Sequence, residues 1–238
     1  MDDFFDADDP RHVPYEADRQ TLLSAMLAIA GSEGWTRAAF DHAVRDSGLP
    51  AERAALIFPD GVLDVLAYDS AVLDRAMVAA LTPEVVKDLR VRARIALGIK
   101  TRIELLAPQE AAAHRAAALL ALPPFAPYGL RLAYRTMDGL WRAIGDQSTD
   151  FNFYTKRALA VGVYLTTLAT WFSDASPDKA RSWATLESQI DRVMMIEGTK
   201  IQLRKFTKYL PSPWPLLGML RYPGSAPASS SDGRPPSA

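Results

Sequence analysis

The chain has 238 residues, of which 49% are hydrophobic, and its formal net charge is −1. This length suffices for one large or two small domains, and the apolar content excludes a wholly disordered chain. Because the chain has no cysteine, disulfides, thiolate metal sites, iron–sulfur clusters and cysteine nucleophiles are excluded.

The chain opens with an acidic arm, residues 1–16, which begins MDDFFDADDP. This arm lacks the apolar core of a secretory signal and the arginine-rich composition of a transit peptide, so we expect a disordered arm and no targeting segment. Beyond it, apolar residues recur at helical spacing, Pro and Gly fall at helix-sized intervals, and strand signals are almost absent. The sequence therefore predicts an all-α protein.

Residues 17–61 are predicted to form a three-helix domain that contains a helix-turn-helix. A helix over about residues 17–33 would bury Leu22, Met26 and Ala30 on one face. Two short helices follow, the first N-capped by Thr36 and the second over about residues 50–57, with a Gly-containing turn between them.

Charge argues against DNA as the ligand of this helix-turn-helix. Residues 1–60 hold nine Asp and three Glu against five Arg, which gives a net charge of −7. DNA affinity depends largely on Lys and Arg that contact phosphates, and the second short helix offers only Arg53. We therefore expect no nucleic-acid partner, and a ligand-responsive transcription regulator is kept as the alternative function.

A larger helical domain is predicted over residues 62–197. Its expected helices cover residues from 62 onward, then about 82–107, 109–122, 128–144, 151–172 and 176–196. The stretch from Ala158 to Phe172 is shorter than the roughly 20 apolar residues that span a bilayer, so a soluble or peripheral protein is expected. The apolar interior could hold a lipid tail, at about 0.8 kcal/mol per buried CH₂, whereas a filled core is the default expectation.

The surface of this domain is basic, because residues 87–157 carry twelve Lys or Arg against six Asp or Glu. Ordinary solvated helix faces would explain this excess. A surface that meets an acidic partner or an anionic membrane would explain it equally well.

Residues 198–222 are predicted to form an amphipathic membrane-contact segment. Gly198 is expected to separate a last short helix, over about residues 199–210, from the helix before it. Apolar and basic side chains lie on opposite sides of this helix, and a Trp follows in a proline-broken apolar stretch. The apolar members are Leu203, Phe206, Leu210 and Trp214, and the basic members are Lys200, Arg204, Lys205 and Lys208. Packing on the chain's own core or on a second subunit stays an open alternative. The tail, residues 223–238, is rich in Pro, Gly and Ser and is expected to be disordered.

No catalytic motif stands out in the chain. Glycine-rich phosphate loops, the G-x-S-x-G turn and the Glu-x-x-His pairs of di-iron bundles are absent. Glu110 and His114 lie four residues apart, which predicts an exposed ion pair or hydrogen bond on one helix face. We therefore expect a protein that is not an enzyme and that holds no metal and no cofactor.

Two segments resemble known families. Residues 22–66, with Gly34, Trp35 and Thr36, resemble the N-terminal domain of TetR-type regulators. The segment GDQSTDFNFYTKR at residues 145–157 is similar to the signature of the Coq accessory protein family, ninth member, of ubiquinone biosynthesis. The flanking residues 90–97, 115–123 and 183–194 agree, so that the resemblance covers about residues 18–196.

This resemblance implies a TetR-like homodimer that binds isoprenoid quinone intermediates or other lipids in its C-terminal domain. Such a protein would contact the membrane surface through its C-terminal helix. It would present substrate to the di-iron demethoxyubiquinone hydroxylase. The expected location is peripheral, on the cytoplasmic side of a bacterial inner membrane or on the matrix side in a eukaryote. The proline-broken stretch around Trp214 departs from the long regular helix of the family.

The resemblance also implies which residues contact the hydroxylase, namely Asp150, Asn152, Phe153 and Tyr154. The family often has Trp at the position of Phe153, which implies a weaker or differently shaped contact here. A local alternative is that Ser148 or Thr149 caps the following helix, Asp150 complements its dipole, and the two aromatic residues pack inward.

Overall fold

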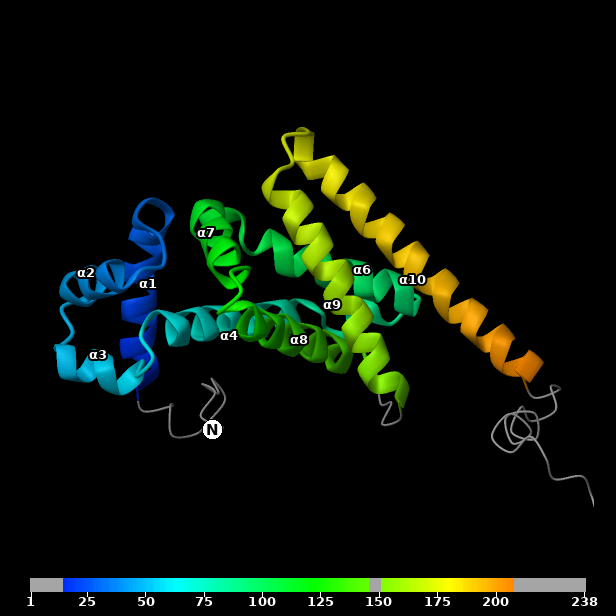
Figure 1. The fold of residues 1–238 in the computed structure, drawn as a ribbon, viewed down its shortest axis with the longest axis horizontal. Helices are drawn as coiled ribbons and strands as arrows, with labels where there is room; N and C mark the ends of the chain where they lie inside the picture. Colours follow the sequence, from blue (N-terminus) through cyan, green and yellow to red (C-terminus); the bar gives the residue numbers. More distant parts are fainter. Residues whose placement is uncertain (1–14, 146–150, 208–238) are drawn as a thin grey trace, which may run out of the picture. The chain divides into compact units, whose positions relative to one another are not determined.

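The computed structural model describes residues 15–145 and 151–207, and every regular element in these ranges is a helix (Figure 1). The predicted all-α class is thereby confirmed. The α-helices are α1 (Glu16–Glu33), α2 (Arg37–Ser47), α3 (Ala51–Ile57), α4 (Val62–Ala80), α5 (Pro83–Val86), α6 (Val91–Glu104), α7 (Glu110–Leu120), α8 (Ala126–Ala143), α9 (Phe151–Phe172) and α10 (Ala180–Thr207). Short 3₁₀ turns cover Ala107–Gln109 and Pro177–Lys179.

The first three helices form a core with the start of α4 and with α7. Leu22, Met26 and Ala30 are fully buried on one face of α1, as the helical spacing predicts. Thr36 caps α2, because its hydroxyl accepts a hydrogen bond of 3.0 Å from the backbone N–H of Ala39. The indole N–H of Trp35 donates to a backbone carbonyl of α7, at Ala112, over 2.9 Å. The helix-turn-helix is thus joined to the rest of the fold by packing and by a buried hydrogen bond.

A second core lies among α4, α6, α8, α9 and the start of α10. Its fully or almost fully buried members include Met77, Ile99, Met137, Trp171 and Leu186. The helices α6 and α8 run antiparallel and pack closely. Gly98 of α6 faces Leu140 of α8, and a Cβ at Gly98 would lie 2.1 Å from a methyl carbon of that leucine. Arg94, one turn earlier on α6, donates to the carbonyl of Ile144, which directly follows α8.

One predicted helix is interrupted. A single helix over residues 82–107 was expected, but α5 ends at Val86 and α6 begins at Val91. Arg90 between them is extended, with φ −67° and ψ 154°. The guanidinium of Arg94 donates to the carbonyls of Leu89 and Lys87, over 2.8 and 3.2 Å. This side chain satisfies the carbonyls that a continuous helix would have bonded, so the single-helix expectation is wrong.

The expected break at Gly198 is also wrong, because α10 is one helix from Ala180 to Thr207. A glycine inside a helix costs only about 1 kcal/mol relative to alanine, and its neighbours in α10 include good helix formers such as Lys200 and Leu203. Among the described helices, none has an apolar stretch that could cross a membrane. The division into domains at residues 61 and 197 stays a prediction, and the acidic arm and the tail lie outside the described residues.

Candidate functional site

The corner between α8 and α9 carries the segment that resembles the family signature. The helix α8 ends at Ala143, and Gly145 follows with a φ of 87°, in the left-handed region that favours glycine. Asn152, Phe153 and Tyr154 lie in the first turn of α9, so the structure brings these three positions together. Their side chains and all of Asp150 lie outside the described residues, so their contact with a partner stays a prediction.

A partly buried carboxylate joins the two helices of this corner. Asp138 of α8 accepts a short hydrogen bond from the guanidinium of Arg157, whose side chain is only 1% exposed. The other oxygen of Asp138 pairs with Arg142 one turn later, over 2.8 Å. Arg157 is the last residue of the signature segment, and no sequence pattern predicted its pairing with Asp138. Its role is to fix the start of α9 against α8, since a buried charge left without its partner is costly.

Two further cations surround the corner. Arg94 reaches from α6 and donates to the carbonyl of Ile144, over 3.1 Å, at the C-terminus of α8. Lys156 of α9 lies over the ring of Trp141, with its ammonium 5.4 Å from the ring centroid. The α8–α9 corner thus carries cations from α6, α8 and α9.

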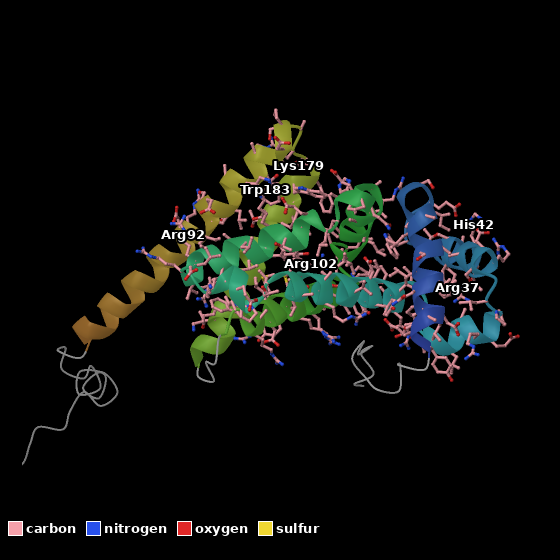
Figure 2. All side chains as sticks on the ribbon, turned by 180° about the vertical axis from the view of Figure 1, so that it is seen from behind. Arg37, His42, Arg92, Arg102, Lys179 and Trp183 are labelled. Carbon is pink, nitrogen blue, oxygen red and sulfur yellow. The ribbon has the colours of Figure 1, made fainter. Side chains whose placement is uncertain are left out.

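The second core contains a polar cluster around Arg102 of α6. This side chain is 4% exposed and lies among the helices (Figure 2), and its Nε donates to Asp74 of α4 over 2.7 Å. Thr136 of α8 donates to the same carboxylate over 2.9 Å, and Ser70 accepts a longer bond of 3.4 Å from Arg102. Tyr164 of α9 is close enough to interact electrostatically with the guanidinium. Four helices therefore contribute polar groups to an otherwise apolar interior.

Asp69 adds a second carboxylate beside this cluster. Burial raises the pKa of Asp69 from 3.8 to about 6, opposed by Arg102 and assisted by the negative charge of Asp74. A raised carboxyl pKa means that the folded chain binds the proton more tightly than the unfolded chain. The free energy of unfolding therefore falls as the pH rises from about 4 to about 6, and it does not recover above that range.

We expect the substitution Asp69→Asn to remove this pH-dependent fall in the free energy of unfolding. The variant should unfold with a free energy higher than the wild type by about 1–2 kcal/mol at pH 7, and the two should converge near pH 4. Urea titrations at pH 4, 5, 6 and 7 measure the difference. An equal difference at all four values would show that Asp69 does not titrate in this window.

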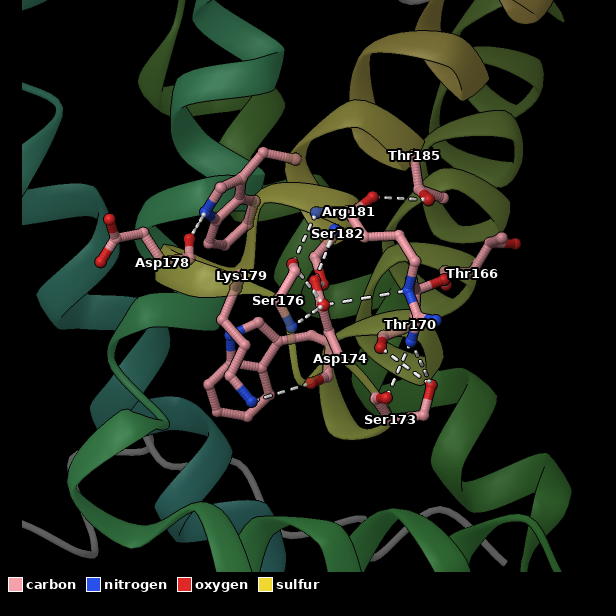
Figure 3. Close-up of polar contacts among 12 residues, drawn as sticks. Thr166, Thr170, Ser173, Asp174, Ser176, Asp178, Lys179, Arg181, Ser182 and Thr185 are labelled. Atoms are coloured by element: carbon pink, nitrogen blue, oxygen red, sulfur yellow. Dashed lines mark hydrogen bonds and ion pairs between the residues drawn. The ribbon is translucent and has the colours of Figure 1, made fainter.

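The corner between α9 and α10 is ordered by a different carboxylate (Figure 3). Asp174 accepts bonds from the hydroxyl and the backbone N–H of both Ser176 and Ser182, over 2.6 to 2.9 Å. Burial alone would raise its pKa, but these serines hold the pKa of Asp174 well below its usual range. Asp178 and Lys179 adopt positive φ values of 52° and 54° in the turn. These bonds order the turn in which α9 ends and α10 begins.

Glu110 and His114 do not pair with each other as predicted, because residues of the same corner contact each of them. Glu110 instead pairs with Lys179, with 2.8 Å between the charged atoms. His114 stacks on Phe172 at the end of α9, with ring centroids 4.8 Å apart. The spacing of four residues placed both on α7, but partners from the α9–α10 corner compete for each of them.

The first part of α10 lies against α6. Arg92 of α6 pairs with Glu187 and Asp191, over 2.8 and 2.7 Å, and Lys100 lies over the ring of Trp183, 5.1 Å from its centroid. Arg92 and Trp183 are both labelled in Figure 2. The predicted membrane-contact residues lie further along the chain, from position 200 onward. Lys200, Leu203, Arg204, Lys205 and Phe206 lie in α10, whereas Lys208, Leu210 and Trp214 lie outside the described residues.

Two observations bear on the alternatives raised by the sequence. Arg53, the cation of the second short helix, pairs with Asp18 over 3.4 Å and lies over the ring of Tyr15, at 5.0 Å. Both contacts direct this guanidinium to other parts of the N-terminal domain.

Across residues 15–145 and 151–207, no group of three or more His, Asp or Glu side chains is placed to hold a metal ion.

Comparison with known proteins adds a family relationship. A family model described as COQ9 matches residues 126–197, which include the α8–α9 corner. The chain is 30% identical over 200 residues to the ubiquinone biosynthesis protein COQ9, mitochondrial, of Bos taurus, and the match covers 80% of this chain and 62% of that protein. The Homo sapiens protein of the same name is 30% identical, with 80% and 63% covered, and the Drosophila melanogaster protein is 27% identical, with 80% and 59% covered. The chain thus spans about three fifths of the length of these curated relatives.

Proposed function

This chain belongs to the COQ9 family, and from that premise we propose that it is a lipid-binding accessory protein of ubiquinone biosynthesis. In this proposal it takes quinone intermediates from a membrane surface and presents them to a di-iron demethoxyubiquinone hydroxylase. The observation that carries the proposal is the match to proteins named for ubiquinone biosynthesis across 80% of the chain, including residues 145–157. The chemistry then belongs to the hydroxylase, and this chain supplies binding and delivery.

The second core supports the lipid-binding part of the proposal. It is built from large aliphatic and aromatic side chains of five helices, and a prenyl tail buried among them would gain about 0.8 kcal/mol for each CH₂ group. The polar cluster around Arg102 lies inside it and offers groups that could orient a ligand. Lipid extraction from the purified chain, followed by mass spectrometry, tests this part. We expect an isoprenoid quinone or a precursor, and a chain without any co-purified lipid would count against it.

The α8–α9 corner supports the delivery part. Asp138 and Arg157 join α8 to α9, and Asn152, Phe153 and Tyr154 lie at the start of α9. Two aromatic residues at one helix start suit the centre of a protein interface, because aromatic anchors there carry much of the binding energy.

Removing the two aromatic side chains tests this corner. The double substitution Phe153→Ala and Tyr154→Ala should weaken binding to the hydroxylase at least tenfold, because each anchor is expected to contribute about 1–2 kcal/mol. The measurement is a pull-down or a calorimetric titration with the purified hydroxylase. A matched control is Leu56→Ala, which removes an exposed apolar side chain of α3 and should leave binding unchanged. Unchanged binding in the double variant, with an intact circular-dichroism spectrum, would place the interface elsewhere.

The later part of α10 supports the membrane part of the proposal. Its sequence places cations and apolar residues on opposite faces, and the helix is continuous to Thr207. Such a helix lies in a membrane surface with its apolar face buried and its cations near anionic headgroups. We propose a peripheral location on the membrane where ubiquinone is made, and a homodimer as the working form.

A transcription regulator remains the second candidate because α1, α2 and α3 have the order of a helix-turn-helix. The charge of −7 over residues 1–60 and the engagement of Arg53 with Asp18 both weaken it. A gel shift with promoter DNA at moderate salt separates the two functions. We expect no shift, and a specific shift would favour the regulator.

A further inference from the structure

The first turn of α6 lies beside the end of α8, at the α8–α9 corner. The guanidinium of Arg94 donates to the carbonyls of Lys87 and Leu89 before α6, and also to the carbonyl of Ile144 directly after α8. One side chain therefore joins the turn before α6 to the residue that precedes the signature segment. Figure 1 shows α6 beginning at the end of the second core where α8 ends.

The register of α6 against α8 carries one face of α6 past the end of α8. Gly98 faces Leu140, and Arg94, four residues earlier, bonds to Ile144, four residues later. One further step of four residues reaches Arg90 on α6, but α8 has already ended. Because residues four apart share one face of a helix, Arg90 continues the face that packs on α8. Among the described residues, no turn of α8 lies opposite it.

This first turn presents a cation and an apolar side chain to the outside. Arg90 is exposed, and its guanidinium makes no hydrogen bond or ion pair within the described part of the chain. Val91, beside it, is 52% exposed. The next two arginines are engaged, because Arg92 pairs with two carboxylates of α10 and Arg94 bonds three carbonyls. Arg90 is therefore the arginine of residues 90–94 that is available to a group from another molecule.

The chemistry of this turn suits a protein surface better than a membrane. A planar guanidinium binds a carboxylate through two parallel hydrogen bonds, and arginine is enriched in protein interfaces. A membrane contact relies on larger apolar side chains, because one valine buries little area in lipid. The turn also adjoins, through Arg94, the corner that is proposed to meet the hydroxylase.

We propose that the first turn of α6 is a second part of the surface that binds the hydroxylase. Arg90 pairs with a carboxylate of the partner, and Val91 packs against an apolar side chain beside that carboxylate. Arg94 is a positioning residue, which acts through the carbonyls that it bonds. This inference rests on the proposed delivery function and extends its interface from the start of α9 to the start of α6.

A labelling experiment tests the position of this surface. The chain has no cysteine, so one introduced thiol reports the accessibility of one residue. Val91→Cys is compared with the control Leu56→Cys on α3, because the two native side chains are similarly exposed, at 52% and 57%. Each full-length variant is labelled with a small maleimide, with and without saturating purified hydroxylase, and the mass of the chain gives the rate. We expect the hydroxylase to slow labelling at position 91 by about fivefold or more, since an interface excludes solvent, and to leave position 56 unchanged.

Charge reversal gives an independent readout. Arg90→Glu should lower the association rate with the hydroxylase by about tenfold at low salt, because charges at an interface act strongly on association, and added salt should shrink the difference. Arg45→Glu is the matched control, since it changes the net charge equally at an exposed arginine of α2. It should associate like the wild type. Both variants should melt like the wild type, because neither guanidinium makes a bond within the described chain.

The outcomes separate this inference from the function on which it rests. If the wild type binds the hydroxylase but Val91→Cys is not protected, or Arg90→Glu associates as fast as the wild type, the extension to α6 is wrong and the α8–α9 contact stands. Equal slowing by Arg90→Glu and Arg45→Glu would reveal a response to net charge, which also contradicts the extension. A wild-type chain that does not bind the hydroxylase would overturn the delivery function and this inference with it.

Discussion

Replacing Arg157 by methionine is expected to lower the free energy of unfolding by about 3–5 kcal/mol. The substitution preserves much of the side-chain volume but leaves Asp138, which is 19% exposed, without its buried cationic partner. The α8–α9 corner would lose the bond that joins its helices, so the first turn of α9 should loosen as well. Urea denaturation followed by circular dichroism measures the loss. Hydrogen exchange at the start of α9 should report the local loosening.

Arg142→Met provides the matched control, because Arg142 pairs with the same carboxylate but is 71% exposed. An exposed pair contributes less than about 1 kcal/mol, so this variant should be nearly as stable as the wild type. The double variant Arg157→Met with Asp138→Leu should recover much of the stability, since no buried charge is then left unpaired. Equal losses for Arg157→Met and Arg142→Met would contradict a buried clamp at Asp138.

Neutralising the basic residues of the predicted membrane-contact segment, residues 198–222, is expected to reduce binding to anionic vesicles by a factor of at least 100. The variant carries Gln at positions 200, 204, 205 and 208, and each Lys or Arg near an anionic surface contributes about 1 kcal/mol at low salt. Vesicles of phosphatidylcholine with 30% phosphatidylglycerol, sedimented at low ionic strength, measure the partition.

The control for this variant replaces Arg37 and Arg45 of α2 by Gln, which removes exposed cations from the N-terminal domain. It should bind the vesicles like the wild type. The wild type should also bind more weakly as salt is added, because screening shortens the reach of the charges. Salt-independent binding, or an unchanged partition of the quadruple variant, would contradict an electrostatic contact through α10.

Local patterns predicted most of the helices because their causes are local. The burial of Leu22 and Met26 follows from helical spacing, and the hydroxyl of Thr36 caps the helix that starts beside it. The two wrong expectations about helix boundaries have non-local or quantitative causes. The guanidinium of Arg94 stabilises the break before α6 from four residues away, and the helix tolerates Gly198 because a single glycine costs little.

The candidate site was predictable only in part. Resemblance selected residues 145–157, and spacing placed Phe153 and Tyr154 at a helix start, which the structure confirms for the backbone. The residues that hold this corner could not be predicted, because Asp138 and Arg157 are 19 residues apart. The pairing of Lys179 with Glu110 spans 69 residues and displaced the expected neighbour His114. Such partners become visible only once α7, α8 and α9 are packed together.

The quinone content of a deletion strain tests the central claim most directly. Deleting the gene for this chain should lower ubiquinone and accumulate a demethoxy or earlier intermediate, measured by mass spectrometry of extracted lipids. Expression of the wild-type chain should restore the profile, whereas the variant with Phe153→Ala and Tyr154→Ala should not. A deletion strain with normal ubiquinone and no accumulated intermediate would contradict a role for this chain in ubiquinone biosynthesis.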